Sequence, residues 1–312
     1  MNDFVRESIP KILEINRNDY EILLYPDKRS DETWPKTRQI ASGPGGPAMK
    51  RSLAIRDAQG DILIFMDDDA YPNSSFLDQL EEDFEDGRIV AVGGPGVTPN
   101  DDGFWQMVSG AVFLSSLSGG FPERYVPVGS KRFVDDWPSV NLSVRKQIFD
   151  QIGGFDSHYW PGEDTKFCLD LIEKTGKKIL YDPQLIACHH RREGLWRHLK
   201  QVGNYGLHRG FFVKRFPKTS CRFKYFLPSI FLLYLVGGAL LSWYFPPLFI
   251  PYLTGLGIYG LALAKALFDI HRYEKNLLIL ICAIPYIFLT HLSYGLRFIQ
   301  GLLTPRLKSR LR

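Results

Sequence analysis

The chain has 312 residues, of which 45% are apolar and 23% charged, enough for one large domain or two smaller ones with a sizeable core. The formal net charge of +4 is too small for a chain of this length to indicate a nucleic-acid partner, and we expect none. The four cysteines form no C-x-x-C pair, which favours free thiols over a zinc site.

Residues 1 to about 190 alternate short apolar runs with amphipathic ones, a pattern typical of an α/β domain. The mixed, charged opening at 1–19 lacks the apolar core of a signal peptide. The continuously apolar run at 61–66 predicts a central strand covered on both faces. Other strands are predicted at 20–25, 88–94, 139–144 and 177–182, and helices at 47–60, 72–87 and 163–176.

Three adjacent carboxylates, Asp67, Asp68 and Asp69, follow the apolar run 61–66 directly. In open α/β sheets ligands bind beyond the carboxyl ends of the strands, where a divalent cation makes clustered carboxylates favourable. Oxygen ligands suit Mg²⁺ or Mn²⁺, which also bind substrate phosphates. The sequence therefore predicts a metal–diphosphate site. The alternative is a solvated acidic turn that caps the next helix.

A second acidic site ends the Gly-rich, aromatic stretch 153–165, where Glu163 and Asp164 open a predicted helix. The helix dipole favours an ionised carboxylate at that end. Because a general base must be ionised, Asp164 is suited to accept a proton. The alternative is an ordinary helix cap with an acidic first turn.

The third site is the segment CHHRREG at 188–194. His189 follows an apolar strand and could add a metal ligand, whereas Arg191 and Arg192 could bind a phosphate. The alternative is a basic surface turn near a membrane.

Together the three sites resemble, in their order, the motifs of a family 2 glycosyltransferase of GT-A fold. An apolar strand ending in D-x-D precedes "GGFD…GED", and a strand ending in histidine follows. "GPAMKRSLAIRDAQGDILIFMDDDAYP" resembles the family's Gly-Pro-Ala…Arg-Asn…Gly-Asp…Asp-x-Asp stretch, and "VNLSVRKQIFDQIGGFD" the segment leading to its Glu-Asp motif. The resemblance covers about residues 4–215 and implies a mixed-sheet α/β domain over 1–215, a nucleotide-sugar donor and a lipid-linked or glycan acceptor, as in cell-surface polysaccharide biosynthesis.

The resemblance also implies the roles of single residues around the metal. Asp67 and Asp69 match the D-x-D that contacts the donor ribose and the metal, with Asp69 the favoured metal ligand and Asp68 between them on the donor side. His189 matches the histidine that helps to hold the metal–diphosphate unit. Mg²⁺ or Mn²⁺ is the implied cofactor.

The other matches concern the base and the nucleotide. Asp164 matches the catalytic base, and Glu163 lies beside it. Asp27 falls where the family contacts the nucleotide base, although this chain has "YPDKRSD" where an acidic pair followed by Gly-Ser is usual. Lys50 and Arg51 stand where the family often has Arg-Asn, which makes them donor contacts.

The implied reaction is a single in-line displacement that inverts the anomeric centre, with the metal neutralising the leaving diphosphate and Asp164 accepting the proton of the acceptor. Three rivals stay open. A haloacid-dehalogenase-type phosphatase would leave the Glu-Asp motif unexplained. A polyprenyl-phosphate sugar synthase has an anionic acceptor and needs no base. An inactive, membrane-anchored transferase-like scaffold would not bind a nucleotide.

One departure from the family concerns the start of the chain. Such enzymes usually open with a strand that forms part of the nucleotide pocket, whereas this chain opens inside the helix that follows it. We therefore expect the first strand to be missing, through a wrong start site, a truncation or a real loss of a central strand. The last case would leave strand edges exposed.

The last third of the chain predicts a membrane region at 216–312. No charged residue occurs from Phe226 to Ala264, a run of roughly 58 Å as a helix, about twice the thickness of a bilayer core. Pro246 and Pro247 break it. The predicted spans lie near 226–245, 247–268 and 276–300. The alternative is a buried helical pair in a soluble core.

Lys and Arg predict the orientation of these spans. The basic segment 208–225 and the loop 265–276 favour the cytoplasm, so we expect an integral membrane protein with a cytoplasmic catalytic domain. Three full spans would place the basic tail outside, against the rule. Either the third segment is a hairpin kinked at Pro285, or the chain breaks the rule.

The segment 194–216 fits a helix at the membrane interface. Its predicted apolar face consists of Leu195, Trp196, Leu199 and Val202, and its basic residues include Arg197, Lys200 and Arg209. Such a helix would hold the active site at the membrane, where Gln201 and Arg209 could reach the acceptor or a pyrophosphate.

Overall fold

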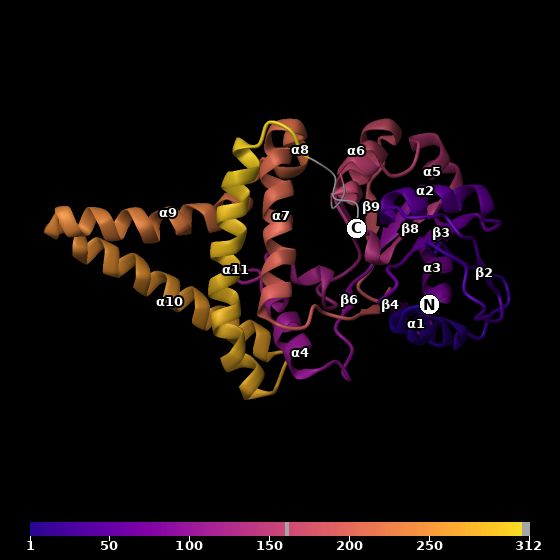
Figure 1. The fold of residues 1–312 in the computed structure, drawn as a ribbon, viewed down its shortest axis with the longest axis horizontal. Coiled ribbons are helices and arrows are strands. Elements are labelled where there is room, and N and C mark those ends of the chain that lie inside the picture. Colours follow the sequence, from indigo (N-terminus) through magenta and orange to yellow (C-terminus); the bar gives the residue numbers. More distant parts are fainter. Residues whose placement is uncertain (160–161, 308–312) are drawn as a thin grey trace. The chain divides into compact units, whose positions relative to one another are not determined.

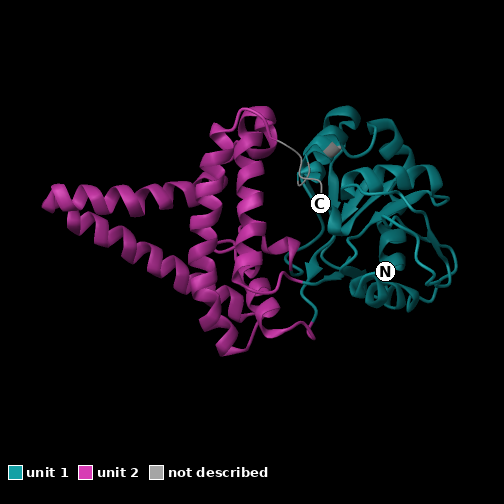
Figure 2. Ribbon diagram, in the orientation of Figure 1, with its two compact units in different colours: residues 1–99, 126–190, 308–312 teal, residues 100–125, 191–307 magenta. Residues whose placement is uncertain are grey.

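The computed structural model describes residues 1–159 and 162–307 and consists of two compact units (Figures 1 and 2). Unit 1 contains residues 1–99 and 126–190, and unit 2 contains residues 100–125 and 191–307. The units therefore do not divide at residue 215. The reason is that the segment 100–125 and the helix that follows residue 194 pack with the C-terminal helices inside unit 2.

Unit 1 is the α/β part of the chain, and the strands and helices that the sequence predicts there are all present. Its helices are α1 (Asp3–Leu13), α2 (Pro47–Asp57), α3 (Phe76–Glu85), α5 (Lys146–Ile152) and α6 (Glu163–Thr175). Its strands are β1 (Ile22–Leu24), β2 (Thr37–Gln39), β3 (Ile62–Phe65), β4 (Ala70–Pro72), β5 (Ala91–Gly93), β6 (Gly96–Val97), β7 (Arg132–Val134), β8 (Leu142–Arg145), β9 (Ile179–Tyr181) and β10 (Ala187–His189).

The strands form three small sheets. A mixed five-stranded sheet has the order β3-β8-β5-β9-β7, β4-β10-β6 is a second sheet, and β1 and β2 form a parallel pair. The prediction that β3 is a central strand is wrong for the described residues, because β3 stands at one end of its sheet and pairs with β8 alone. Both of its faces are nevertheless covered: Leu63 and Phe65 enter one core cluster, and Ile64 packs against another.

Local sequence explains the helices that flank the site. α2 begins with Pro47, whose fixed φ suits the first helical position. α3 buries Phe76, Leu80 and Phe84 at helical spacing. α6 ends at Gly176, whose φ of +69° is the left-handed conformation that glycine adopts without strain.

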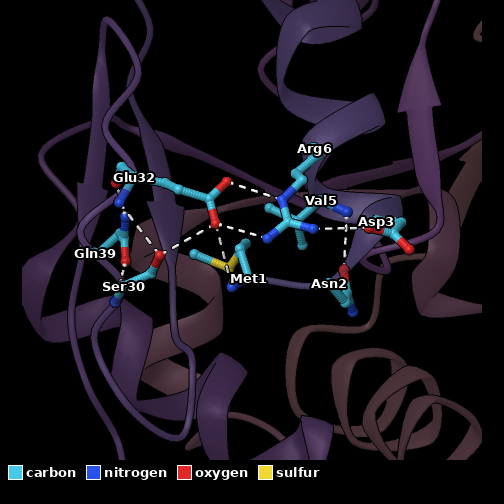
Figure 3. Close-up of polar contacts among 8 residues, drawn as sticks. All are labelled: Met1, Asn2, Asp3, Val5, Arg6, Ser30, Glu32 and Gln39. Carbon is cyan, nitrogen blue, oxygen red and sulfur yellow. Dashed lines mark hydrogen bonds and ion pairs between the residues drawn. The ribbon is translucent and has the colours of Figure 1, made fainter.

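α1 is fixed at its N-terminal end by polar contacts (Figure 3). The Asn2 side chain caps the helix, because its Oδ1 accepts a hydrogen bond from the Val5 N–H at 2.9 Å. Arg6 donates two hydrogen bonds to the Glu32 carboxylate, each 3.0 Å long. Asn2 also donates from Nδ2 to Asp68 at 2.6 Å. These contacts tie α1 to the loop after β1 and to the acidic turn after β3. The absence of the strand with which such enzymes usually begin stays a prediction.

Unit 2 is helical. It contains α4 (Phe104–Ala111), α7 (Leu195–Arg215), α8 (Pro217–Ser220), α9 (Phe223–Tyr244), α10 (Phe249–His271) and α11 (Leu277–Leu303). Within the described residues, three helices are long and apolar enough to cross a membrane: α9, α10 with the turn before it, and α11. The predicted break at Pro246 is confirmed. α11 continues through Pro285 as one helix, so of the two alternatives for this segment the hairpin kinked at Pro285 is wrong.

α7 forms where a helix is predicted, and contact of its predicted apolar face with a membrane stays a prediction. Of that face, Val202 is buried and Trp196 is 82% exposed. The face of α7 that packs against α11 is rich in small residues, with Gly203, Gly206 and Gly210. Tertiary contact with α11 therefore decides which face of α7 is covered.

Candidate active site

The site is built where β3 and β10 end. β3 ends at Phe65, and the acidic turn leads directly into β4. β4 pairs antiparallel with β10, in a register that sets His189 opposite Ala70. The His190 N–H then donates to the carbonyl of Asp69 at 3.1 Å. This pairing brings a histidine from the end of the unit's sequence to the acidic turn.

Asp67, Asp69 and His189 form a cluster whose ligand atoms all lie within 4.8 Å of one another. His189 Nε2 lies 3.3 Å from Asp69 Oδ1, and both side chains are largely buried, with 12% and 4% of their surfaces exposed. Asp67, with 34% of its side chain exposed, and the buried Asp69 repel each other at this distance, and a shared cation relieves that repulsion. Two carboxylate oxygens and one imidazole nitrogen suit Mn²⁺, and also Mg²⁺. The residues present therefore fit the divalent metal that the sequence predicts.

Arg51 joins the two acidic motifs. Its guanidinium pairs with Asp67, donates to Ser139 Oγ at 2.8 Å and lies 3.4 Å from Glu163 Oε1. α2 thereby holds the first residue of the D-x-D and the first residue of α6 through one side chain. The predicted contact with the donor would therefore come from a guanidinium that Asp67 and Glu163 already hold.

Glu163 and Asp164 are neighbours in very different surroundings. Glu163 is buried, and this burial, reinforced by the charge of Asp164 and opposed by Arg51, raises its pKa to about 7. Its Oε2 accepts from the Gly162 N–H at 2.9 Å. Asp164 is less buried, and its Oδ1 accepts from the Thr165 N–H at 2.7 Å. Both carboxylates stand in the first turn of α6, as predicted.

The remaining predicted donor residues lie outside the metal cluster. The side chain of Asp27 is largely exposed and pairs with Lys50, the residue before Arg51 in α2. Asp68 is exposed and accepts from Asn2, while its carbonyl accepts from Ser8 Oγ at 2.8 Å. The middle aspartate therefore secures the turn to α1.

The predicted phosphate and acceptor residues belong to unit 2. Arg191 is buried, with its guanidinium over the ring of Tyr125, 4.9 Å from the centroid. Arg209 lies over the ring of Tyr225 at 5.0 Å and donates to the carbonyl of Thr219 at 3.4 Å. Arg192 and Gln201 are half-buried. None of the four belongs to the metal cluster found among the described residues.

Sequence reasoning missed two residues beside the acidic motifs. Ser139 accepts from Arg51, and the buried Asp136 accepts from Thr165 Oγ1 at 3.2 Å. The signal that points to them is "DDWPS" at 135–139, in which two acids precede a tryptophan that the structure buries completely. A buried carboxylate needs a partner, and Thr165 of α6 supplies one.

Residues 2–138 match the model of the family described as Glycosyl transferase family 2. Residues 2–138, less than half of the chain, are therefore similar to this family, and the fold is GT-A-like. The mannosyltransferase PcManGT from Pyrobaculum calidifontis, solved in complex with GDP-Man and Mn²⁺, is a structural neighbour with a TM-score of 0.55 and 16% sequence identity. The likeness covers 96% of this chain and 83% of that one, and it supports the fold alone.

Two curated relatives share part of the sequence. The pre-mycofactocin glycosyltransferase of Mycobacterium tuberculosis is 27% identical over 198 residues, which cover 64% of this chain and 39% of that protein. The dolichyl N-acetyl-alpha-D-glucosaminyl phosphate 3-beta-D-2,3-diacetamido-2,3-dideoxy-beta-D-glucuronosyltransferase of Methanococcus voltae is 24% identical over 216 residues, which cover 64% of this chain and 66% of that protein. The chain therefore spans less than two thirds of either relative.

Proposed function

We propose that this chain is an inverting glycosyltransferase that moves a sugar from a nucleotide sugar to a hydroxyl of a lipid-linked or glycan acceptor at the cytoplasmic face of a membrane. The observation that carries the proposal is the cluster of Asp67, Asp69 and His189 at the carboxyl ends of two strands. The family 2 domain and a relative named for a dolichyl-phosphate-linked sugar acceptor support it.

Asp69 and His189 would hold the metal ion, and Asp67 would contact the metal and the donor ribose. When bound, Mg²⁺ or Mn²⁺ neutralises charge on the leaving diphosphate. Asp27 and Lys50 contact the nucleotide.

The acceptor side of the reaction belongs to α6. Asp164 accepts the proton of the acceptor hydroxyl as the new glycosidic bond forms and the bond to the diphosphate breaks. Glu163, with its pKa raised to about 7, holds a proton for much of the time near neutrality and so limits the negative charge next to the base. A single displacement of this kind inverts the anomeric centre.

The test is metal-dependent nucleotide binding by the full chain in detergent. UDP, GDP and other nucleoside diphosphates are titrated with and without Mn²⁺ into the wild type and into Asp69→Asn. Asp61→Asn is the matched control, because Asp61 is an exposed carboxylate at the opposite end of β3. We expect one nucleotide to bind only with Mn²⁺, and Asp69→Asn to weaken that binding at least about tenfold.

Two results would contradict the proposal. Equal nucleotide binding by Asp69→Asn and Asp61→Asn would show that the D-x-D motif does not contribute to the donor site. No binding by the wild type to any nucleotide, in a preparation that melts cooperatively, would favour the inactive scaffold.

A further inference from the structure

The three apolar helices of unit 2 differ in how much of each is already covered by protein. In the most apolar window of each helix, 6% of α9, none of α10 and 33% of α11 is buried. α9 and α10 project away from the α7–α11 pair and meet at the far tip of a hairpin, while α11 runs beside α7 (Figure 1). By length and composition α11 is a candidate membrane span, but it is covered by protein far more than α9 or α10.

α11 is joined to α7 along most of the length of α7. His198 Nε2 and Thr290 Oγ1 lie 2.8 Å apart near one end of the contact, and Lys214 Nζ donates to the carbonyl of Thr304 at 2.9 Å near the other. The two helices therefore run parallel. A Cβ added at Gly210 would lie 2.1 Å from the carbonyl oxygen of Phe298, so the backbones are in direct contact.

α7 is too charged to enter a bilayer core. It carries five Lys and Arg residues, namely Arg197, Lys200, Arg209, Lys214 and Arg215. Each costs roughly 2.5–3.5 kcal/mol at the centre of a spanning helix. Because the C-terminal half of α11 contacts α7 backbone to backbone, α11 cannot cross the membrane without taking these charges along.

α9 and α10 have the opposite character. They expose apolar side chains along their length, among them Leu233, Val236 and Leu261, and contain no charge from Phe226 to Ala264. At about 33 and 35 Å, each is long enough for a hydrocarbon core of about 30 Å. Trp243 and Tyr244 at the hairpin tip are the residue types that settle at a membrane–water interface.

We propose that only α9 and α10 cross the membrane, as a hairpin, and that α11 lies with α7 along the membrane surface on the side of unit 1. The partner of this surface is the lipid bilayer itself. The face of α11 that remains exposed is apolar, with Ile281, Leu296 and Leu303, and meets acyl chains near the headgroups. The cations of α7 and of Lys218, Arg222 and Lys224 before the first span meet the phosphates.

This arrangement removes the conflict with the positive-inside rule. With two spans instead of three, the basic residues that follow α11 return to the side of the basic segment before α9. The proposed membrane topology does not depend on glycosyl transfer. Either this proposal or the proposed function can therefore fail its own test without affecting the other.

The test maps the sidedness of single cysteines. Cys168, Cys188, Cys221 and Cys282 are replaced in the full chain, and one cysteine is returned at Ser74, Leu248, Lys275 or Arg306, all exposed positions. Right-side-out and inverted membrane vesicles are treated with a membrane-impermeant maleimide. Only variants that purify and melt like the cysteine-free chain are compared.

We expect Ser74→Cys, Lys275→Cys and Arg306→Cys to react from one side and Leu248→Cys from the other. Labelling of Arg306→Cys from the side of Leu248→Cys would establish three spans and overturn the proposal. Labelling of Leu248→Cys from neither side would overturn it too, because the hairpin would not cross. As a second readout, Val236→Lys should lower membrane insertion severalfold, whereas Leu296→Lys should leave it nearly unchanged; equal loss in both would contradict a surface position for α11.

Discussion

His189 Nε2 lies 3.3 Å from Asp69 Oδ1, a distance fixed by the register of β4 and β10. A ring nitrogen and a carboxylate oxygen this close together can bind one metal ion jointly. The contact between His189 and Asp69 is therefore the geometric basis of the predicted metal site.

Loss of the histidine ligand should weaken metal binding without unfolding the chain. For His189→Ala we expect Mn²⁺ affinity, measured by the electron paramagnetic resonance signal of free Mn²⁺, to fall about tenfold or more. His158→Ala is the control, because that ring is exposed and pairs with Asp156 at 2.7 Å. Equal affinities in the two variants would exclude His189 from the site.

Removal of Arg51 should destabilise unit 1. In Arg51→Met, Asp67 and Glu163 lose the cation between them, and the cost is about 2 kcal/mol after allowance for the partial exposure of Asp67. Arg56→Met is the control, because Arg56 is exposed on the same helix. The measurement is the melting temperature. If Arg51→Met melts no lower than Arg56→Met, the contacts of Arg51 with Asp67 and Glu163 contribute nothing to stability.

Glu163 should make the folded state less stable as the pH rises. Its pKa is raised from 4.5 to about 7 on folding, so between these values the folded chain keeps a proton that the unfolded chain has released. Stability from this group is thus complete below about pH 4.5 and lost as the pH rises through about 7, a change of roughly 3 kcal/mol. Melting curves of Glu163→Gln should show a weaker pH dependence across this window. An unchanged dependence would contradict the raised pKa.

Substitution of the proposed base separates two kinds of acceptor. With a hydroxyl acceptor, Asp164→Asn should lower turnover about 10²- to 10⁴-fold while nucleotide affinity is unchanged. The measurement is transfer of a radiolabelled sugar to extracted lipid, beside nucleotide titration. Full activity would mean that the acceptor is already an anion, as in a polyprenyl-phosphate sugar synthase.

The close contact between α7 and α11 should not tolerate a methyl group. In Gly210→Ala the new Cβ meets the carbonyl of Phe298, and we expect a loss of about 1–3 kcal/mol. Gly257→Ala on α10 is the control, since a Cβ there has no atom within 4 Å. Melting in detergent micelles compares the two. A loss no greater than in the control would show that the helices separate easily.

The strands and helices of unit 1 could be predicted from local sequence patterns. A strand at 61–66 followed by acids, and a helix opened by Glu163, depend on neighbours in the sequence, and both are present. The approach of His189 to the acidic turn was implied by the family resemblance, since the residues alone made it only one possible metal ligand. The place of β3 at one end of its sheet depends on which strands pair with it, and hydropathy carries no such information.

The packing of unit 2 was less accessible to sequence reasoning. An apolar helix reads alike whether lipid or protein covers it, so α11 was indistinguishable from α9 by composition. The distinguishing residues are glycines, Gly206 and Gly210 on α7 and Gly301 on α11, which matter only when the two helices meet.

The pairing of α7 with α11 also fixes an order of events during synthesis. α7 emerges from the ribosome before the hairpin, and its partner α11 emerges after the hairpin. Until α11 is made, the glycine face of α7 and the apolar side chains Val108 and Val112 have no cover from that helix. Unit 2 is therefore completed only after α11 has been synthesised, and until then these faces are open to non-native contacts.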